Sequence, residues 1–449
     1  MSVVPETSTV KRALSAHAAI GLLAGALLYI VCLSGTLLVF YEEWQRVETG
    51  NPPQMTAIAP DAVQRGMEAM LALEEGKPPT THFYVDLPLE ELPTTRVITD
   101  TESYHIDAQG RLAGTEDIEW SNFLYGLHYT LNIPVAQGLV GITLVGILGM
   151  LMLALSISGV FAHPKIFRDA FRLRTRHGGG VALSDWHNRL SVWTLPFGLA
   201  IALTGAMIGL ASVAAYSAAA LYHDGDVEAF YATIFGEEGE PDPTPAPLPD
   251  VATALRYMAA NYPDVRPTFV AVHEPGTAGQ HVQVVAEHPR RLIFGEYYMF
   301  DSHGRFHGTA GMSDGDLGKQ AAASNYSLHF GNFGGWPVKL LYALFGFALT
   351  AVAATGAYIW LGKRARRGLH EPRLRAAWNG VIIGAPASLA LTVIARIYLG
   401  NEAPLAAVFW LSLAVITAAA TALSGHGRAA KPAANASSGE AKAVKISSN

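Results

Sequence analysis

The chain is poor in cysteine and in charged residues. Its 449 residues include one cysteine, Cys32, so neither an internal disulfide nor a Cys-x-x-Cys-His site for covalent haem is possible. Only 15% of the residues are Asp, Glu, Lys or Arg and 50% are hydrophobic, which is too apolar for a soluble chain of this length. The net charge of −6 argues against nucleic acid as a partner.

Common catalytic signatures are also missing. The sequence has no glycine-rich phosphate loop, no dinucleotide-binding fingerprint and no nucleophile elbow. If electrons pass through this chain, it carries no flavin or nicotinamide domain to collect them.

Long apolar runs are abundant. A bilayer core about 30 Å thick requires roughly 20 apolar residues in a helix. The first run is followed by Tyr41-Glu42-Glu43-Trp44 and not by a small-residue cleavage site, so we expect it to remain as a helix and not to be removed as a signal peptide. The predicted spans are 18–40, 138–162, 192–215, 337–361, 380–400 and 404–424.

Basic residues fix the predicted orientation. Lys11 and Arg12 precede the first span, and clusters of Lys and Arg follow the second span and separate the fourth from the fifth. The segments 41–120 and 222–316 are acidic by comparison. Because basic loops stay in the cytoplasm, the pattern predicts cytoplasmic N- and C-termini and two large segments outside the membrane.

The sequence contains an internal duplication. In each copy a histidine opens an apolar run, and a Ser/Thr-Gly pair follows at a fixed distance of 18 residues from the histidine to the glycine. A second histidine precedes the next span, which ends in another such pair. Duplicated units of this kind commonly build membrane bundles with internal symmetry. The matched landmarks are His17 with Ser34-Gly35 and His187 with Thr204-Gly205, then His128 with Ser158-Gly159 and His329 with Thr355-Gly356.

The segments between the spans repeat as well. Residues 104–115 match residues 298–309, and each stretch is typical of a strand, a glycine-containing turn and a second strand. A helical stretch and another strand precede each hairpin. The predicted fold is therefore a membrane α-helical bundle of about six transmembrane helices, made from a duplicated helix–module–helix unit, with two small α+β periplasmic modules.

This organisation divides the chain into six parts. They are a first repeat at 11–162 with its module at 41–120, a basic cytoplasmic loop at 163–186, a second repeat at 187–362 with its module at 222–316, a second basic loop at 363–377, a helical hairpin at 378–424 and a disordered cytoplasmic tail at 425–449.

Four histidines are the candidate cofactor ligands. The predicted topology puts His17 and His187 at the cytoplasmic ends of spans one and three, and His128 and His329 at the outer ends of spans two and four. Each pair takes one member from each repeat. Neutral imidazole is the usual axial ligand of haem iron in a helix bundle, so the pairs predict two non-covalent haem b groups whose iron is bound by these histidines. The alternative is that the histidines and the Ser/Thr-Gly pairs serve helix packing alone.

The remaining polar residues give weaker signals. Five histidines lie along predicted strands with no metal-ligand spacing. Arg396, near the outer end of the fifth span, is expected to reach the membrane interface. The five histidines on predicted strands are His82, His105, His273, His281 and His288.

The chain resembles the PepSY-associated transmembrane (PepSY_TM) family. The resemblance rests on Ala16-His17 with Ser34-Gly35-Thr36, on Asp185-Trp186-His187-Asn188-Arg189, and on Leu328-His329-Phe330-Gly331. The hairpins with Asp107-x-x-Gly110 and Asp301-x-x-Gly304 are similar to those of PepSY domains. The resemblance covers about residues 11–365, so the helical hairpin at 378–424 lies outside it.

The resemblance implies a protein of the bacterial cytoplasmic (inner) membrane that is associated with iron uptake. Some relatives resemble siderophore reductases, which would make this chain an oxidoreductase with two b-type haems, one on His17 with His187 and one on His128 with His329. It would pass electrons across the membrane from a quinol or a cytoplasmic reductase to a periplasmic ferric siderophore or other iron chelate.

Two other functions fit parts of the pattern. PepSY modules elsewhere resemble inhibitors or chaperones of peptidases, so the chain could instead bind a peptide, a peptidase or an iron chelate without redox chemistry. An iron-chelate permease is a third reading, although the spans contain no carboxylate and no broken-helix pair to mark a transport path.

Overall fold

The computed structural model describes residues 7–171, 180–235, 242–287, 292 and 295–426. The tail predicted to be disordered lies outside the described residues from 427 onward, as do part of the first basic loop and His288.

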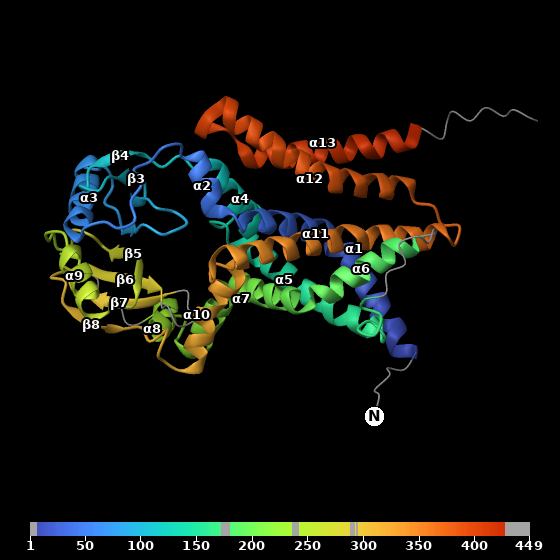
Figure 1. The fold of residues 1–449 in the computed structure, drawn as a ribbon, viewed down its shortest axis with the longest axis horizontal. Coiled ribbons are helices and arrows are strands. Elements are labelled where there is room, and N and C mark those ends of the chain that lie inside the picture. The colour runs from blue at the N-terminus through green and yellow to red at the C-terminus, as the bar shows by residue number, and fades with distance from the viewer. Residues whose placement is uncertain (1–6, 172–179, 236–241, 288–291, 293–294, 427–449) are drawn as a thin grey trace, which may run out of the picture.

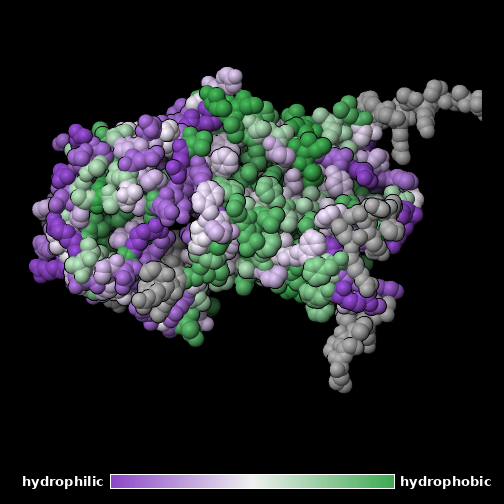
Figure 2. Space-filling view, viewed as in Figure 1, coloured by the Kyte–Doolittle hydropathy of each residue, from purple (hydrophilic) through white to green (hydrophobic). Residues whose placement is uncertain are grey.

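Within these ranges, six helices are long and apolar enough to cross a membrane, which confirms the predicted number of spans. They lie side by side, with a β-sheet beyond one end of the bundle (Figure 1). Apolar side chains cover the middle of the molecule, and hydrophilic ones cover the sheet (Figure 2). The spanning helices are α1 (Thr7–Leu38), α5 (Leu139–Ala162), α7 (Leu195–Tyr222), α11 (Gly335–Ala365), α12 (Pro372–Leu399) and α13 (Leu405–His426).

Shorter helices flank the spans and are separated from them by breaks with local causes. The helix before α7 ends at Trp193, and Pro196 in the first turn of α7 has no N–H to continue it. Gly331 and Gly334 take positive φ values of 70° and 82° between another short helix and α11. The short helices are α2 (Tyr41–Glu48), α4 (Glu119–Tyr129), α6 (Val181–Trp193), α8 (Val227–Phe235) and α10 (Leu317–Phe330).

The extramembrane segments of both repeats build one sheet and not two. The described strands run in the order β4-β3-β2-β1-β5-β6-β7-β8, and every neighbouring pair is antiparallel. The two modules join at the β1–β5 pair, the first strand of each. Their bounds are β1 (His82–Asp86), β2 (Thr95–Ile98), β3 (Ser103–Ile106), β4 (Leu112–Thr115), β5 (Arg266–His273), β6 (His281–Glu287), β7 (Glu296–Phe300) and β8 (Phe306–Thr309).

Joining the modules satisfies two strand edges at once. An unpaired edge presents free N–H and C=O groups, so pairing β1 with β5 removes one such edge from each module. Two helices, α3 (Pro60–Leu73) and α9 (Val251–Asn261), cover the sheet face that points away from the bundle (Figure 1). Buried apolar side chains fill the space between these two helices and the sheet, including Met67, Phe83, Met258 and Val272.

Glycine lies where the backbones of α5 and α7 approach each other closely. A Cβ at Gly146 of α5 would lie 2.7 Å from the carbonyl carbon of Gly209 in α7. Close approach of this kind is the usual role of small residues between membrane helices.

The α12–α13 hairpin packs on the first repeat. Phe409 is fully buried, and its ring centroid lies 6.0 Å from that of Phe123 in α4. The Trp410 indole donates a hydrogen bond to the Leu131 carbonyl just beyond α4. The hairpin therefore covers α4, a role that its sequence did not reveal.

Arg396 pairs with an acidic residue of the first repeat. Its Nε lies 2.9 Å from Glu48 Oε1 and its side chain is 19% exposed. The guanidinium therefore forms an ion pair at the end of α2, and its position at the membrane interface stays a prediction.

Candidate functional site: two pairs of histidines

The structure brings the four candidate histidines together in two pairs, and each pair joins the two repeats. His17 of α1 and His187 of α6 have ring centroids 6.4 Å apart, with their planes at 86°. We call these two the distal pair, because they lie at the end of the bundle away from the sheet. His128 of α4 and His329 of α10 have centroids 6.1 Å apart and planes at 32°, and we call them the sheet-side pair.

Both spacings suit a single metal ion between two imidazoles. A metal–imidazole bond is about 2 Å long, so two rings on opposite sides of one ion have centroids roughly 6 Å apart. Haem iron with two axial histidines is such an arrangement. All four rings are half-buried, as a cofactor-binding position requires.

Each imidazole is oriented through Nδ1 in the same way. His17 Nδ1 lies 3.0 Å from the Leu155 carbonyl and 3.2 Å from Ser158 Oγ. His128 Nδ1 lies 2.9 Å from the Val31 carbonyl and 3.4 Å from Ser34 Oγ.

The second repeat shows the same arrangement. His187 Nδ1 lies 2.9 Å from Thr355 Oγ1, and His329 Nδ1 lies 3.0 Å from Thr204 Oγ1. Both rings also bond to the carbonyl three residues before that threonine, at Val352 and Ile201 respectively. One carbonyl and one hydroxyl therefore hold each of the four rings.

These hydrogen bonds select the tautomer. A carbonyl can only accept, so Nδ1 carries the proton and donates it. Nε2 then keeps its lone pair, which is the form in which histidine binds a metal, and an outer hydrogen bond of this type is the usual support of a metal-bound histidine.

Glycine leaves room for each ring. A Cβ on Gly35 would lie 2.6 Å from His128 Cε1, and one on Gly205 would lie 2.9 Å from His329 Cε1. The corresponding distances are 3.3 Å from Gly159 to His17 and 3.7 Å from Gly356 to His187. The Ser/Thr-Gly pairs are thus cradles for imidazoles. The close approach of α5 and α7 lies elsewhere, at Gly146 and Gly209.

The cradles show how the duplication builds the site. His17 rests on α5 and His128 rests on α1, so the first repeat holds both of its own histidines. The second repeat does the same with α11 and α7. Each repeat therefore orients its own ligands and offers them to the ligands of the other.

The helix assignments differ in part from the sequence expectation. His17 lies well inside α1, which begins at Thr7, and His187 lies on the separate helix α6 and not on the third span. His128 and His329 both lie on short helices ahead of their spans. His128 precedes Gly159 by 31 residues, and His329 precedes Gly356 by 27. The difference arises from the longer connection at 130–138, compared with 331–334.

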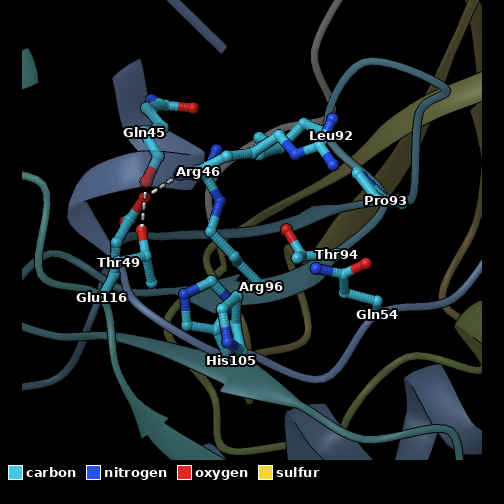
Figure 3. Close-up of a pocket in the computed structure, with 11 residues that line it drawn as sticks. Gln45, Arg46, Thr49, Gln54, Leu92, Pro93, Thr94, Arg96, His105 and Glu116 are labelled. Carbon is cyan, nitrogen blue, oxygen red and sulfur yellow. Dashed lines mark hydrogen bonds and ion pairs between the residues drawn. The ribbon is translucent and has the colours of Figure 1, made fainter. Parts of the chain in front are cut away.

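A separate polar pocket lies in the first module. It has room for about one water molecule and is lined in part by Thr94, Arg96, His105 and Glu116 (Figure 3). Burial, with the nearby Arg96 guanidinium, lowers the pKa of His105 to about 4. Neither nitrogen of His105 has a hydrogen-bond partner among the described residues. The pocket suits an ordered water and is too small for a chelate.

The comparison with known families rests on the same residues. A family described as "PepSY-associated TM region" matches residues 14–363, a stretch that contains all four histidines and their glycines. The chain belongs to this family. It is also similar to "Uncharacterized protein PA4219" of Pseudomonas aeruginosa, with 26% identity over 261 residues. That match covers 54% of this chain and 64% of the relative, slightly less than two thirds of its length.

Proposed function

We propose that this PepSY_TM protein is a b-type haem protein of the bacterial inner membrane that reduces a ferric chelate, such as a siderophore, in the periplasm. The observation that carries the proposal is the fourfold repetition of one arrangement, in which an imidazole is held through Nδ1, backed by glycine and opposed by a second imidazole about 6 Å away. Packing alone does not require the same tautomer and the same cradle at all four positions.

The four histidines would hold two haems, one at each end of the bundle. Bound haem supplies one-electron redox chemistry. The chain contributes axial nitrogens, fixed ring orientations and an apolar surrounding, and these are the features through which a protein sets the potential of a haem. Haem would be non-covalent, because Cys32 is the single cysteine in the sequence.

The orientation in the membrane is part of the proposal. Lys363 and Arg364 lie at the end of α11 away from the sheet, and the segments that build the sheet carry the acidic excess. The positive-inside rule then puts both termini in the cytoplasm and the sheet in the periplasm. A quinol or a cytoplasmic reductase would supply electrons on the distal side.

Reduction of the iron would explain a role in iron uptake. Oxygen-rich chelators hold Fe(III) through hard donor atoms, and Fe(II) is less charged and softer, so it is bound less tightly. The ferric chelate is the substrate here and would be approached from the sheet side.

The decisive experiment is a reduced-minus-oxidised spectrum of the purified protein with a quantified haem-to-protein ratio. We expect about two b-type haems per chain, and about one after His17→Ala with His187→Ala. His303→Ala is a matched control, because His303 lies in the exposed β7–β8 turn. A colourless preparation, or full haem content in the double variant, would rule the proposal out.

A non-redox binding protein remains the second candidate. In the described sheet, β4 and β8 form the two edges, and a sheet edge can accept an added peptide strand. Such a protein could bind a peptide, a peptidase or an iron chelate. It would be purified without visible absorbance.

A further inference from the structure

Three histidines that are far apart in the sequence form one row across the sheet. His82 of β1 is the register partner of His273 in β5, and His273 is the register partner of His281 in β6. Register partners on adjacent strands point to the same face. The row exists only because the two modules share a sheet, since His82 comes from the first repeat and the other two come from the second.

The rings of this row are in contact. Those of His273 and His281 are stacked, with centroids 4.5 Å apart and planes at 4°. The centroids of His82 and His273 lie 5.4 Å apart. Both nitrogens of His281 are buried and make no hydrogen bond to any described residue. An imidazole left in this state costs free energy unless it gains a partner.

The row lies on the sheet face that is turned toward the bundle. Phe83 and Val272, the neighbours of His82 and His273 along their strands, pack beneath α3 and α9, so the histidines point to the opposite face. Tyr297 of β7 lies on that face too. Tyr297 packs against a small cluster that contains Ala323 of α10, so this face adjoins the helix carrying His329.

We propose that His273 and His281, with His82 beside them, bind a divalent transition-metal ion. Imidazole is a preferred donor for Zn(II), Cu(II), Ni(II) and Fe(II), whereas Mg(II) and Ca(II) prefer oxygen. In the described part of the chain no three His, Cys, Asp or Glu side chains converge as they lie, so the row supplies two protein ligands and water completes the shell.

Binding requires the two rings to leave their parallel stack. An ion about 2 Å from each of two nitrogens joins nitrogens up to about 4 Å apart. Each lone pair lies in the plane of its ring, and the planes of His273 and His281 are within 4° of parallel, so at least one ring must rotate before both nitrogens face one ion. The side chain of His82 is 46% exposed, which leaves the row open to solvent. Its Nδ1 lies 2.9 Å from Thr81 Oγ1, and Asp100 Oδ1 is 3.8 Å away, so Nε2 is the nitrogen directed to a ligand.

The ion that the reaction would supply is Fe(II). This assignment rests on the proposed function, whereas metal binding by the row does not. Iron released from an oxygen-rich chelator after reduction would meet nitrogen donors on the same side of the bundle.

The test is a calorimetric titration of Zn(II) into the full chain, purified in detergent with haem in place and without a polyhistidine tag. Zn(II) has no redox chemistry and cannot change the oxidation state of haem. We expect one ion per chain and at least a tenfold loss of affinity in His273→Gln with His281→Gln. His303→Gln with His307→Gln is the matched control, because these two side chains lie outside the row on the β7–β8 hairpin.

Unchanged Zn(II) affinity in the row variant, or an equal loss in the control, would overturn the proposal. His82→Gln replaces an exposed side chain, so it tests the row even if the double variant fails to fold, and we expect a smaller loss of affinity. Competition by Fe(II) under anaerobic conditions tests the identity of the ion. A colourless preparation that still binds Zn(II) would refute the haem proposal and support this one.

Discussion

The two helices that carry the sheet-side histidines, α4 and α10, have the same ligand and different supports. His128 and His329 match in hydrogen bonding and in their glycine cradles. The outer surface of α4 is covered by the α12–α13 hairpin. On α10, Phe330 is 42% exposed, more than its counterpart Tyr129 on α4, whereas Tyr125 and Tyr326 are alike at 40% and 38%.

A glutamate with little exposed surface stabilises the chain near the start of each helix, but the two glutamates come from different elements. Glu48, at the end of α2, accepts hydrogen bonds from the backbone N–H groups of Trp120 and Ser121 in the first turn of α4, and from the Ser121 hydroxyl. This carboxylate also pairs with Arg396.

In the second repeat Glu296 of β7 accepts bonds from the N–H groups of Met312 and Ser313 and from the Ser313 hydroxyl. The two repeats therefore share the ligands and their immediate contacts, whereas each half has its own means of holding the helix in place.

The largest expected effect comes from filling the cradles. We expect Gly35→Ala to remove sheet-side haem, because the new Cβ would overlap the His128 ring, and Gly205→Ala to act similarly. Gly356→Ala should be nearly silent, since its Cβ would lie 3.7 Å from His187. Haem-to-protein ratios of the three alanine variants measure this order. A greater loss in Gly356→Ala than in Gly35→Ala would contradict it.

The next largest effect should come from weakening the contact between the α12–α13 hairpin and α4. Phe409→Ala removes a fully buried ring that packs on Phe123, which should cost about 3–5 kcal/mol. Hydrogen exchange should accelerate in α4 and stay unchanged in α10. Phe347→Ala, at a 55% exposed position on α11, is the control. Equal acceleration in both helices would show that the hairpin supports the whole bundle.

A smaller effect should follow from Glu48→Gln. The amide keeps one acceptor but leaves Arg396 without its carboxylate partner, at a cost of about 1–3 kcal/mol. Thermal unfolding should begin at a lower temperature, and the sheet-side haem should change its spectrum before the distal one. Glu296→Gln is the corresponding variant in the second repeat, and it should perturb the His329 side instead.

The smallest effect is a dependence on pH in the first module. His105 is 4% exposed, and burial lowers its pKa from 6.5 to about 4, whereas the second repeat has Met299 at the matching position. Between pH 6.5 and 4 the unfolded chain binds a proton that the folded chain does not, so the free energy of unfolding falls as the pH falls.

The expected loss is about 2 kcal/mol. Exchange rates in β3 between pH 7 and 4.5 measure it, and His105→Met should flatten the profile. A pH dependence that persists in His105→Met would assign it to another group.

The sequence predicted the spans and the candidate histidines because those signals are local. Hydropathy marks each span in one window, and His17 and His187 stand out because each recurs at a fixed distance from a glycine. Haem binding itself stays a proposal. Other features depend on contacts between distant segments: the β1–β5 junction, the Arg396–Glu48 pair and the His82–His273–His281 row. No spacing within one segment encodes them, so they became visible only in the fold.

The β1–β5 junction also bears on how such a chain could arise. These strands are equivalent members of the two repeats, and the two histidine pairs likewise join equivalent residues. All three contacts therefore relate to one approximate twofold axis. A single copy of the unit would carry the same strand edge and half of each ligand set, and it could complete both by self-association. Fusion of the two genes would then have made a symmetric dimer permanent, which freed one half to recruit the α12–α13 hairpin.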